Sequence, residues 1–166
     1  VQQCTNQQFT GPLSLAAWNT TALLCVDFYK AQLRTDHVAR ILKSAKILAL
    51  QETHSSDGSE HPWTQAHQGD SWDFWNHGTQ SVGGSALILD KVWTRKYFGD
   101  PGTDSWIILE TSRLARLSLQ GSLGNLDIFV VYASHDSILG RRKTLVTMAS
   151  NIKPRPNCLT LVMGDF

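Results

Sequence analysis

The apolar positions of the chain group into short segments that are typical of buried strands. These segments occupy residues 13–18, 47–51, 86–89, 106–109, 114–119, 126–132 and 159–163. The second of them is continuous and apolar, which indicates a strand that is covered on both faces. Residues 72–75 alternate instead, as expected of a strand at the edge of a sheet. The chain is therefore expected to be rich in strands.

Two segments have the spacing of an amphipathic helix. In residues 34–45 the apolar side chains recur at helical intervals, at Val38, Ile41, Leu42 and Ala45. Residues 141–152 form a second such segment, which must end before Pro154. The order along the chain is strand, helix, strand, several strands, helix, strand. This order favours a layered α/β fold with mixed sheets.

The rest of the chain is expected to form a tail and loops around one domain. Residues 1–12 are polar and Gln-rich, and we interpret them as a tail or linker. Residues 13–166 form the domain, because a chain of 166 residues can bury a sizeable core. Residues 55–69 are polar and predict a loop. Four histidines in or near this loop have irregular spacing and are interpreted as exposed rather than ligating: His54, His61, His67 and His77.

Three of the strand-like runs end in a side chain that can bind a hard cation through oxygen. Asn19 follows the first run, Glu52 follows the second, and Asp165 follows the last one after a glycine. Binding sites in layered α/β folds gather at the carboxyl ends of strands. Carboxylate and amide oxygens are the ligands that Mg²⁺ and Ca²⁺ take in proteins. The sequence therefore predicts a shared cation site at these strand ends.

Five short motifs, in this order, resemble the endonuclease/exonuclease/phosphatase superfamily. They are Trp18-Asn19, Leu50-Gln51-Glu52-Thr53, Gly83-Gly84-Ser85-Ala86-Leu87-Ile88-Leu89, Tyr132-Ala133-Ser134 and Met163-Gly164-Asp165-Phe166. The closest resemblance is to the endonuclease domains of LINE-type retrotransposons and to their AP-endonuclease relatives. It implies a DNase I-like fold, which is a two-layer β-sandwich flanked by helices. It covers nearly the whole chain but only the first part of the family's domain, so we expect a truncated domain, incomplete at the C-terminus.

The resemblance also implies roles for individual residues. Glu52 and Asn19 would hold the catalytic Mg²⁺, or Mn²⁺ in its place. Asp165 would orient or deprotonate the attacking water, and Tyr132 would donate a hydrogen bond to the scissile phosphate. The family normally has an Asp or Asn two positions after Asn19, where this chain has Thr21. A hydroxyl is a weaker ligand for a hard cation than a carboxylate.

A second set of residues is expected to contact phosphate. Arg142 and Arg141 lie near the place of a family arginine, and a guanidinium suits two-point contact with phosphate. His135 is a third candidate, because an imidazolium can donate to phosphate. The family commonly has Pro and Asn where this chain has Ser134 and His135.

The resemblance implies metal-dependent hydrolysis of a phosphodiester, most naturally as a DNA endonuclease. DNA would be the partner, and a reverse-transcriptase domain would follow in a longer polyprotein. The family's late Ser-Asp-His motif, which carries the general base, is absent from the sequence, so this stretch alone is expected to be inactive. Two alternatives remain: a phosphatase or lipid phosphodiesterase on the same fold, and a non-catalytic remnant.

Charge, cysteines and hydropathy narrow these functions only slightly. A net charge of +1 shows no basic footprint of the kind that a strong DNA binder often has. Three cysteines without a paired spacing favour reduced thiols in an intracellular protein. For an enzyme that acts on DNA, the expected location includes the nucleus. No apolar run approaches the roughly 18 residues of a membrane span, and no signal peptide is visible.

Overall fold

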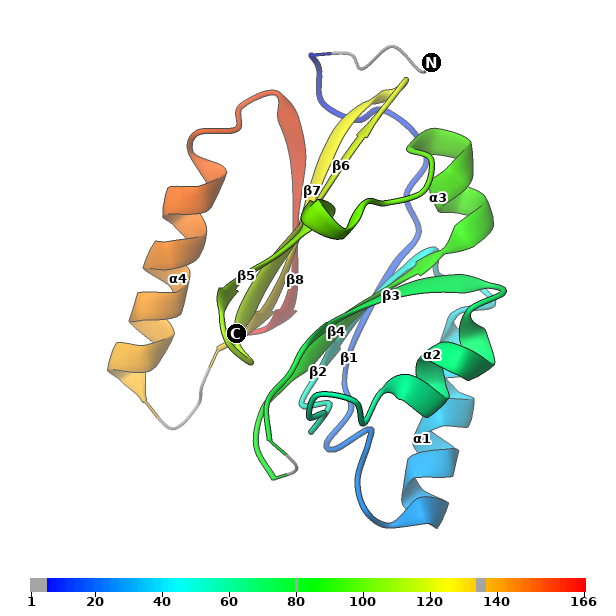
Figure 1. Cartoon of the computed structure of the whole chain (residues 1–166). Coiled ribbons are helices and arrows are strands. Elements are labelled where there is room, and N and C mark those ends of the chain that lie inside the picture. Colours follow the sequence, from blue (N-terminus) through cyan, green and yellow to red (C-terminus); the bar gives the residue numbers. More distant parts are fainter. Residues whose placement is uncertain (1–5, 80, 134–136) are drawn as a thin grey trace.

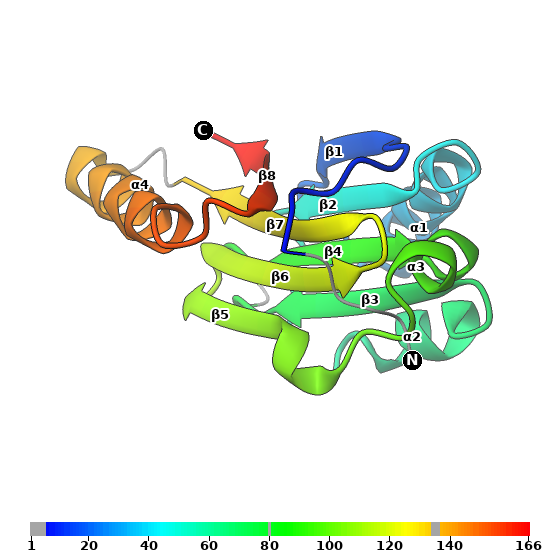
Figure 2. The ribbon, with the colours of Figure 1, turned by 90° about the horizontal axis from the view of Figure 1, so that it is seen from above.

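Two four-stranded sheets stack face to face, with helices on the outside, in the computed structural model of the chain (Figure 1). The structure describes residues 6–79, 81–133 and 137–166. Figure 2 shows the two sheets as adjacent layers, with α1 and α2 beyond one sheet and α4 beyond the other. This arrangement confirms the predicted α/β sandwich.

The first sheet has the strand order β1-β2-β4-β3. Its strands are β1 (Leu15–Asn19), β2 (Ile47–Gln51), β3 (Ser71–Asn76) and β4 (Ser85–Asp90). β1 and β2 are parallel, and the crossover between them contains α1 (Phe28–Ile41). β4 pairs antiparallel with both β2 and β3. The short helix α2 (His61–His67) lies between β2 and β3 in the chain.

The second sheet has the order β5-β6-β7-β8. Its strands are β5 (Trp106–Glu110), β6 (Leu114–Gly121), β7 (Gly124–Tyr132) and β8 (Cys158–Asp165). The first three form an antiparallel meander. β8 returns parallel to β7 after the crossover helix α4 (Ile138–Ile152). The connection from β4 to β5 contains the helix α3 (Lys91–Tyr97) and the 3₁₀ turn η1 (Thr103–Ser105).

The main core lies between the inner faces of the two sheets. Ile47 and Ala49 of β2 meet Ile128 and Val130 of β7 there, and all four side chains are buried. The alternate residues of β2 face outward into a second cluster, in which Val38 of α1 packs. A third cluster lies between the outer face of the second sheet and α4. Strands that are covered on both faces need apolar residues at successive positions, which explains the continuous apolar sequence of β2 and β4.

Local hydrogen bonds decide where the two predicted helices begin. α1 starts at Phe28 rather than at residue 34, because Asp27 caps it and accepts a hydrogen bond from the Lys30 backbone N–H at 3.1 Å. α4 starts at Ile138, where the hydroxyl of Ser137 accepts from the Gly140 N–H at 3.0 Å. Among the described residues, no helix has the length and apolar character needed to cross a membrane.

Two short helices were not predicted, and both depend on one buried aromatic residue. α2 lies within the segment that was expected to be a polar loop, and only its Trp63 is buried among apolar neighbours. α3 places Trp93 in the main core. A helix of two turns with a single apolar anchor leaves no periodic pattern to detect.

Residues 6–12 pack on the domain, whereas a tail or linker was expected. Phe9 is 4% exposed and belongs to the main core, where its ring lies against those of Trp93, Tyr97 and Phe98. The Phe9 N–H donates to the Asn125 carbonyl at 2.9 Å. The segment and α3 thus close one end of the sandwich, at the top in Figure 1.

We predict that Phe9→Ala lowers the free energy of unfolding by about 3–5 kcal/mol, because it removes a large buried side chain from the core. The matched control is Phe28→Ala, since Phe28 is 81% exposed; its effect should stay within about 0.5 kcal/mol. Urea denaturation followed by tryptophan fluorescence measures both. Equal stability of the two variants would show that residues 6–12 are a free tail.

Candidate active site at the strand ends

Four of the predicted site residues stand at the carboxyl ends of strands along one edge of the sandwich. Asn19 ends β1 and pairs with Gln51, which directly precedes Glu52. Tyr132 ends β7 and pairs with Asp165 of β8. Because β1 and β2 are parallel, and so are β7 and β8, the carboxyl ends within each pair point the same way. In Figure 1 this edge is the lower one.

Two hydrogen bonds cross from the first sheet to the second at this edge. The phenol of Tyr132 donates to Oε1 of Glu52 at 2.9 Å. Nδ2 of Asn19 donates to Oδ2 of Asp165, also at 2.9 Å. The structure therefore brings the four residues together, as expected if they form one site.

The backbone of Glu52 is held in an unusual conformation. Its φ of 51° lies in the left-handed region, which costs a residue with a side chain about 1–3 kcal/mol and persists only where the surroundings enforce it. Here they do: the Glu52 carbonyl accepts from the Thr20 hydroxyl at 3.0 Å and from the Ala22 N–H at 2.7 Å. The segment after β1 thus fixes the backbone conformation of the half-buried Glu52 at the end of β2.

Both ends of the Asn19 amide are engaged. Its Oδ1 accepts from the Thr21 N–H at 3.1 Å, while its Nδ2 donates to Asp165. These two partners assign the amide orientation, because only the oxygen accepts and only the nitrogen donates. The oxygen keeps a second lone pair that can face a cation. Thr21 contributes its backbone N–H here, and its own φ is 47°.

Gly164 permits the close approach of β8 to β7 that positions Asp165. A Cβ at this glycine would lie 1.9 Å from the carbonyl oxygen of Val131, which is far inside van der Waals contact. The exposed Asp165 is then held by its carbonyl, which accepts from the Ala133 N–H at 2.9 Å. The glycine of the Gly-Asp pair is thus a packing requirement, since any larger residue would push β8 away.

No protein-family model and no curated protein matches this chain. Solved structures do. A humanised D. rerio TDP2 has a TM-score of 0.65 at 16% identity, over 92% of this chain and 65% of that one. The 3′ phosphatase NExo from Neisseria, bound to a product DNA hairpin, has a TM-score of 0.63 at 16% identity, over 93% and 58%. A truncated C. elegans TDP2 has a TM-score of 0.59 at 22% identity, over 92% and 61%.

The chain has the DNase I-like fold. At these identities the likeness shows the fold alone, so the roles of individual residues still depend on the site's own geometry. The chain spans 65%, 58% and 61% of the lengths of the three structures just named. The similarity covers 92–93% of this chain, so it includes both of the sheets described above.

Sequence reasoning missed Arg113, which lies directly before β6. Its guanidinium lies over the ring of Tyr132, with the guanidinium carbon 5.4 Å from the ring centroid. Among the described residues, its Nη1 is buried and has no hydrogen-bond partner. The Arg113 carbonyl also accepts from the Tyr132 N–H at 2.7 Å. A cation with a free donor beside the site suits an anionic ligand. No motif surrounds this arginine, so only the fold reveals it.

Three further residues were expected to contact phosphate. Arg141 and Arg142 lie near the start of α4; Arg141 is half-buried and Arg142 is exposed. Within residues 6–79, 81–133 and 137–166, no hydrogen bond or ion pair joins either arginine to the four-residue cluster. His135 falls outside the described residues. The phosphate-binding role of all three stays a prediction.

The clustered residues fit a hard divalent cation. Glu52 is half-buried, and its carboxylate accepts a hydrogen bond from the neutral phenol of Tyr132. In the described part of the chain, no Lys or Arg forms an ion pair with Glu52 or Asp165. Two nearby carboxylates without a cation are unfavourable when one is partly buried. Carboxylate and amide oxygens at this edge are the donor set that Mg²⁺ takes.

We predict that Gly164→Ala lowers the free energy of unfolding by about 1–3 kcal/mol, because the new methyl group collides with the Val131 carbonyl. Gly69→Ala is the matched control, since a Cβ at Gly69 has nothing within 4 Å; its effect should stay within about 0.5 kcal/mol. Chemical denaturation of the two variants is the measurement. A Gly164→Ala protein as stable as the control would contradict the close passage of β8 along β7.

Proposed function

We propose that the chain is the N-terminal part of a metal-dependent phosphodiesterase that cleaves DNA, of the LINE-like or AP-endonuclease-like type. The observation that carries the proposal is the pair of hydrogen bonds that joins Glu52 to Tyr132 and Asn19 to Asp165 across the two sheets. Two structural neighbours support DNA as the substrate: one is a D. rerio TDP2 with a single-strand DNA product, and the other is NExo with its DNA hairpin.

Each clustered residue has a defined task in this reaction. Glu52 and Oδ1 of Asn19 would hold Mg²⁺ or Mn²⁺, and the ion supplies charge neutralisation and Lewis-acid polarisation of the phosphate. Asp165 would orient the attacking water through the oxygen that Asn19 does not occupy. The Asn19 amide keeps the Asp165 carboxylate in one rotamer, which reduces the entropy lost on reaching the reactive geometry.

The phosphate would be held by donors on the second sheet. The Tyr132 hydroxyl now donates to Glu52, and it can turn to a phosphate oxygen once a cation neutralises that carboxylate. The free Nη1 of Arg113 adds positive charge beside the same ring. Arg141, Arg142 and His135 would contact the flanking phosphates from the start of α4 and the segment before it.

The general base is expected to come from outside these 166 residues, since the sequence contains no Ser-Asp-His triplet. General acid–base catalysis is commonly worth about 10²–10⁴ in rate. We therefore propose that the chain acts within a longer intracellular or nuclear protein, in which a reverse-transcriptase domain follows the LINE-like endonuclease.

A 3′ phosphatase is the second candidate. NExo carries that activity and has the same fold at a TM-score of 0.63. A phosphomonoester needs the same metal and the same attacking water. Release of phosphate from a 3′-phosphorylated oligonucleotide, without nicking of intact plasmid, would favour this alternative.

We predict that Mg²⁺ binds to the chain and that Glu52→Gln weakens this binding at least about tenfold, because a carboxylate ligand is lost. Asp104→Asn is the control, since Asp104 is an exposed carboxylate in η1. Asn19→Ala should have a smaller effect than Glu52→Gln, because it removes an uncharged ligand. Calorimetric titration measures all of these affinities. Equal affinity of wild type and Glu52→Gln would place the cation elsewhere.

We predict that the 166-residue chain does not nick supercoiled plasmid in Mg²⁺ above background. A longer protein that also contains a Ser-Asp-His segment should nick, and Asp165→Asn should lower its rate by about 10²-fold or more. Asp104→Asn should leave the rate unchanged. Gel electrophoresis of the plasmid forms is the measurement. Robust nicking by the short chain that survives Glu52→Gln would refute both the assigned site and the need for a later base.

A further inference from the structure

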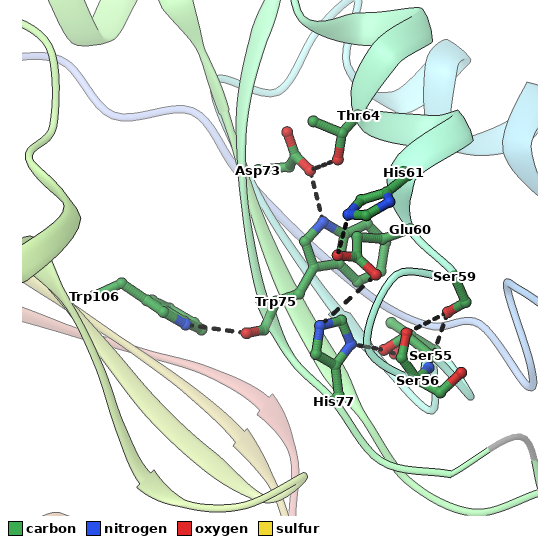
Figure 3. A network of polar contacts seen from close by, with 11 residues as sticks. Ser55, Ser56, Ser59, Glu60, His61, Thr64, Asp73, Trp75, His77 and Trp106 are labelled. Atoms are coloured by element: carbon green, nitrogen blue, oxygen red, sulfur yellow. Dashed lines mark hydrogen bonds and ion pairs between the residues drawn. The ribbon is translucent and has the colours of Figure 1, made fainter.

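A second group of potential metal ligands lies on the loop that follows Glu52. One oxygen of Asp57, one oxygen of Glu60 and one ring nitrogen of His77 all lie within 4.8 Å of one another. Asp57 and Glu60 belong to the segment between β2 and α2, and His77 directly follows β3. Figure 3 shows Glu60 and His77 facing each other across this gap. The four strand-end residues described above take no part in this group.

The carboxylate of Glu60 has an unmet need for positive charge. Its side chain is only 12% exposed, and in the described structure its Oε2 is buried without a hydrogen-bond partner. The two nearest rings do not meet this need. Nε2 of His77 is 3.7 Å from Oε2, and Nε2 of the largely exposed His61 is 3.7 Å from Oε1. Both distances exceed a hydrogen bond. A buried carboxylate oxygen without a donor is costly unless a cation lies beside it.

The ring of His77 is fixed in the orientation that a metal ligand needs. Its Nδ1 is 3.1 Å from the hydroxyl of Ser55. Ser55 is fully buried, and its hydroxyl also meets that of Thr53 at 3.0 Å. The His77 ring is nearly parallel to that of Trp75, at an interplanar angle of 7°. Histidines that bind metals characteristically engage their other ring nitrogen in such a hydrogen bond. The remaining nitrogen, Nε2, is the atom that faces Glu60.

We propose that Asp57, Glu60 and His77 bind one divalent transition-metal ion, with zinc as the favoured ion. Zinc–ligand bonds of about 2.0–2.1 Å place the ligand atoms of a tetrahedral site about 3.3 Å apart. The 3.7 Å between Glu60 and His77 is within a few tenths of an ångström of that separation. Imidazole nitrogen selects zinc over Mg²⁺ and Ca²⁺, which prefer oxygen alone. This separates the site from the oxygen-only cluster at Glu52.

The ion would link two segments that are distant in the chain. Asp57 and Glu60 lie on the loop after β2, whereas His77 comes later in the chain, after α2 and β3. The same loop is already joined to the start of β4, because the Thr53 N–H donates to the Gly84 carbonyl at 3.2 Å. A bound ion would therefore stiffen the segment that leaves Glu52. The fourth coordination position is open to water or to the ring of the exposed His61.

The test is a calorimetric titration of metal-free chain with Zn²⁺ in the presence of excess Mg²⁺. One zinc per chain is expected, together with a higher midpoint of thermal unfolding than in chelator. Glu60→Gln and His77→Gln should each weaken zinc binding at least about tenfold, and Ser55→Ala by about 10–100-fold. His37→Gln is the matched control, since His37 contacts Trp18 and Arg40 rather than the cluster; it should bind zinc as wild type does.

A readout on the wild-type chain keeps the proposal testable where a variant fails to fold. Zn²⁺ should shift the ring-proton resonances of His77 with one-to-one stoichiometry, and Co²⁺ in its place should give visible absorption bands. The proposal is wrong if the wild-type chain binds no zinc saturably. It is equally wrong if folded Glu60→Gln and His77→Gln bind as wild type does, or if Glu52→Gln alone removes the zinc.

Discussion

The contact between the inner faces of the two sheets is the constraint on which the rest of the molecule depends. Ile47 and Ala49 on one side and Ile128 and Val130 on the other are buried in it, so the two sheets cannot slide without opening apolar surface to water. A slip of one residue in any strand would also turn its core side chains outward. The two cross-sheet hydrogen bonds at the strand ends exist only because this packing holds the edges in line.

The second sheet needs a separate anchor, because β8 is reached only after a long crossover. Asp127 of β7 is 1% exposed and accepts from the guanidinium of Arg155, which lies just before β8. The Asp127 carboxylate raises the pKa of Arg155, and burial raises the pKa of the neighbouring Cys158 thiol. Removing one partner of such a buried pair commonly costs about 3–5 kcal/mol. This pair fixes the start of β8, and Gly164 lets its far end bring Asp165 to the site.

The site itself is built at some cost to stability. Glu52 combines a left-handed backbone with a half-buried carboxylate, and the side chain of Glu60 on the following loop is only 12% exposed. Hydrogen bonds from the Thr20 hydroxyl and the Ala22 N–H hold the backbone of Glu52, but they do not compensate the charge of its carboxylate. A bound cation would offset the negative charge at each carboxylate. The proposed cation differs between the two, because the Glu52 site offers only oxygen ligands and the Glu60 site also offers an imidazole nitrogen. Strain that the surroundings enforce is typical of functional positions.

The sequence by itself determined most of the strands, because apolar residues gather in the segments that the sheets bury. It also placed Asn19, Glu52 and Asp165 at strand ends, because each of these polar residues closes an apolar segment. It did not determine α2, α3 or the packing of Phe9, because one buried aromatic residue leaves no period. Arg113, Asp57 and Glu60 were missed for a related reason, since their neighbours in space are remote in the chain. For the same reason His77 was interpreted as exposed, whereas its side chain is only 25% exposed. Only the tertiary structure decided which ends meet: Tyr132 reaches Glu52 over 80 positions and Asp165 reaches Asn19 over 146. Such pairings follow from how whole sheets pack, which no local pattern records.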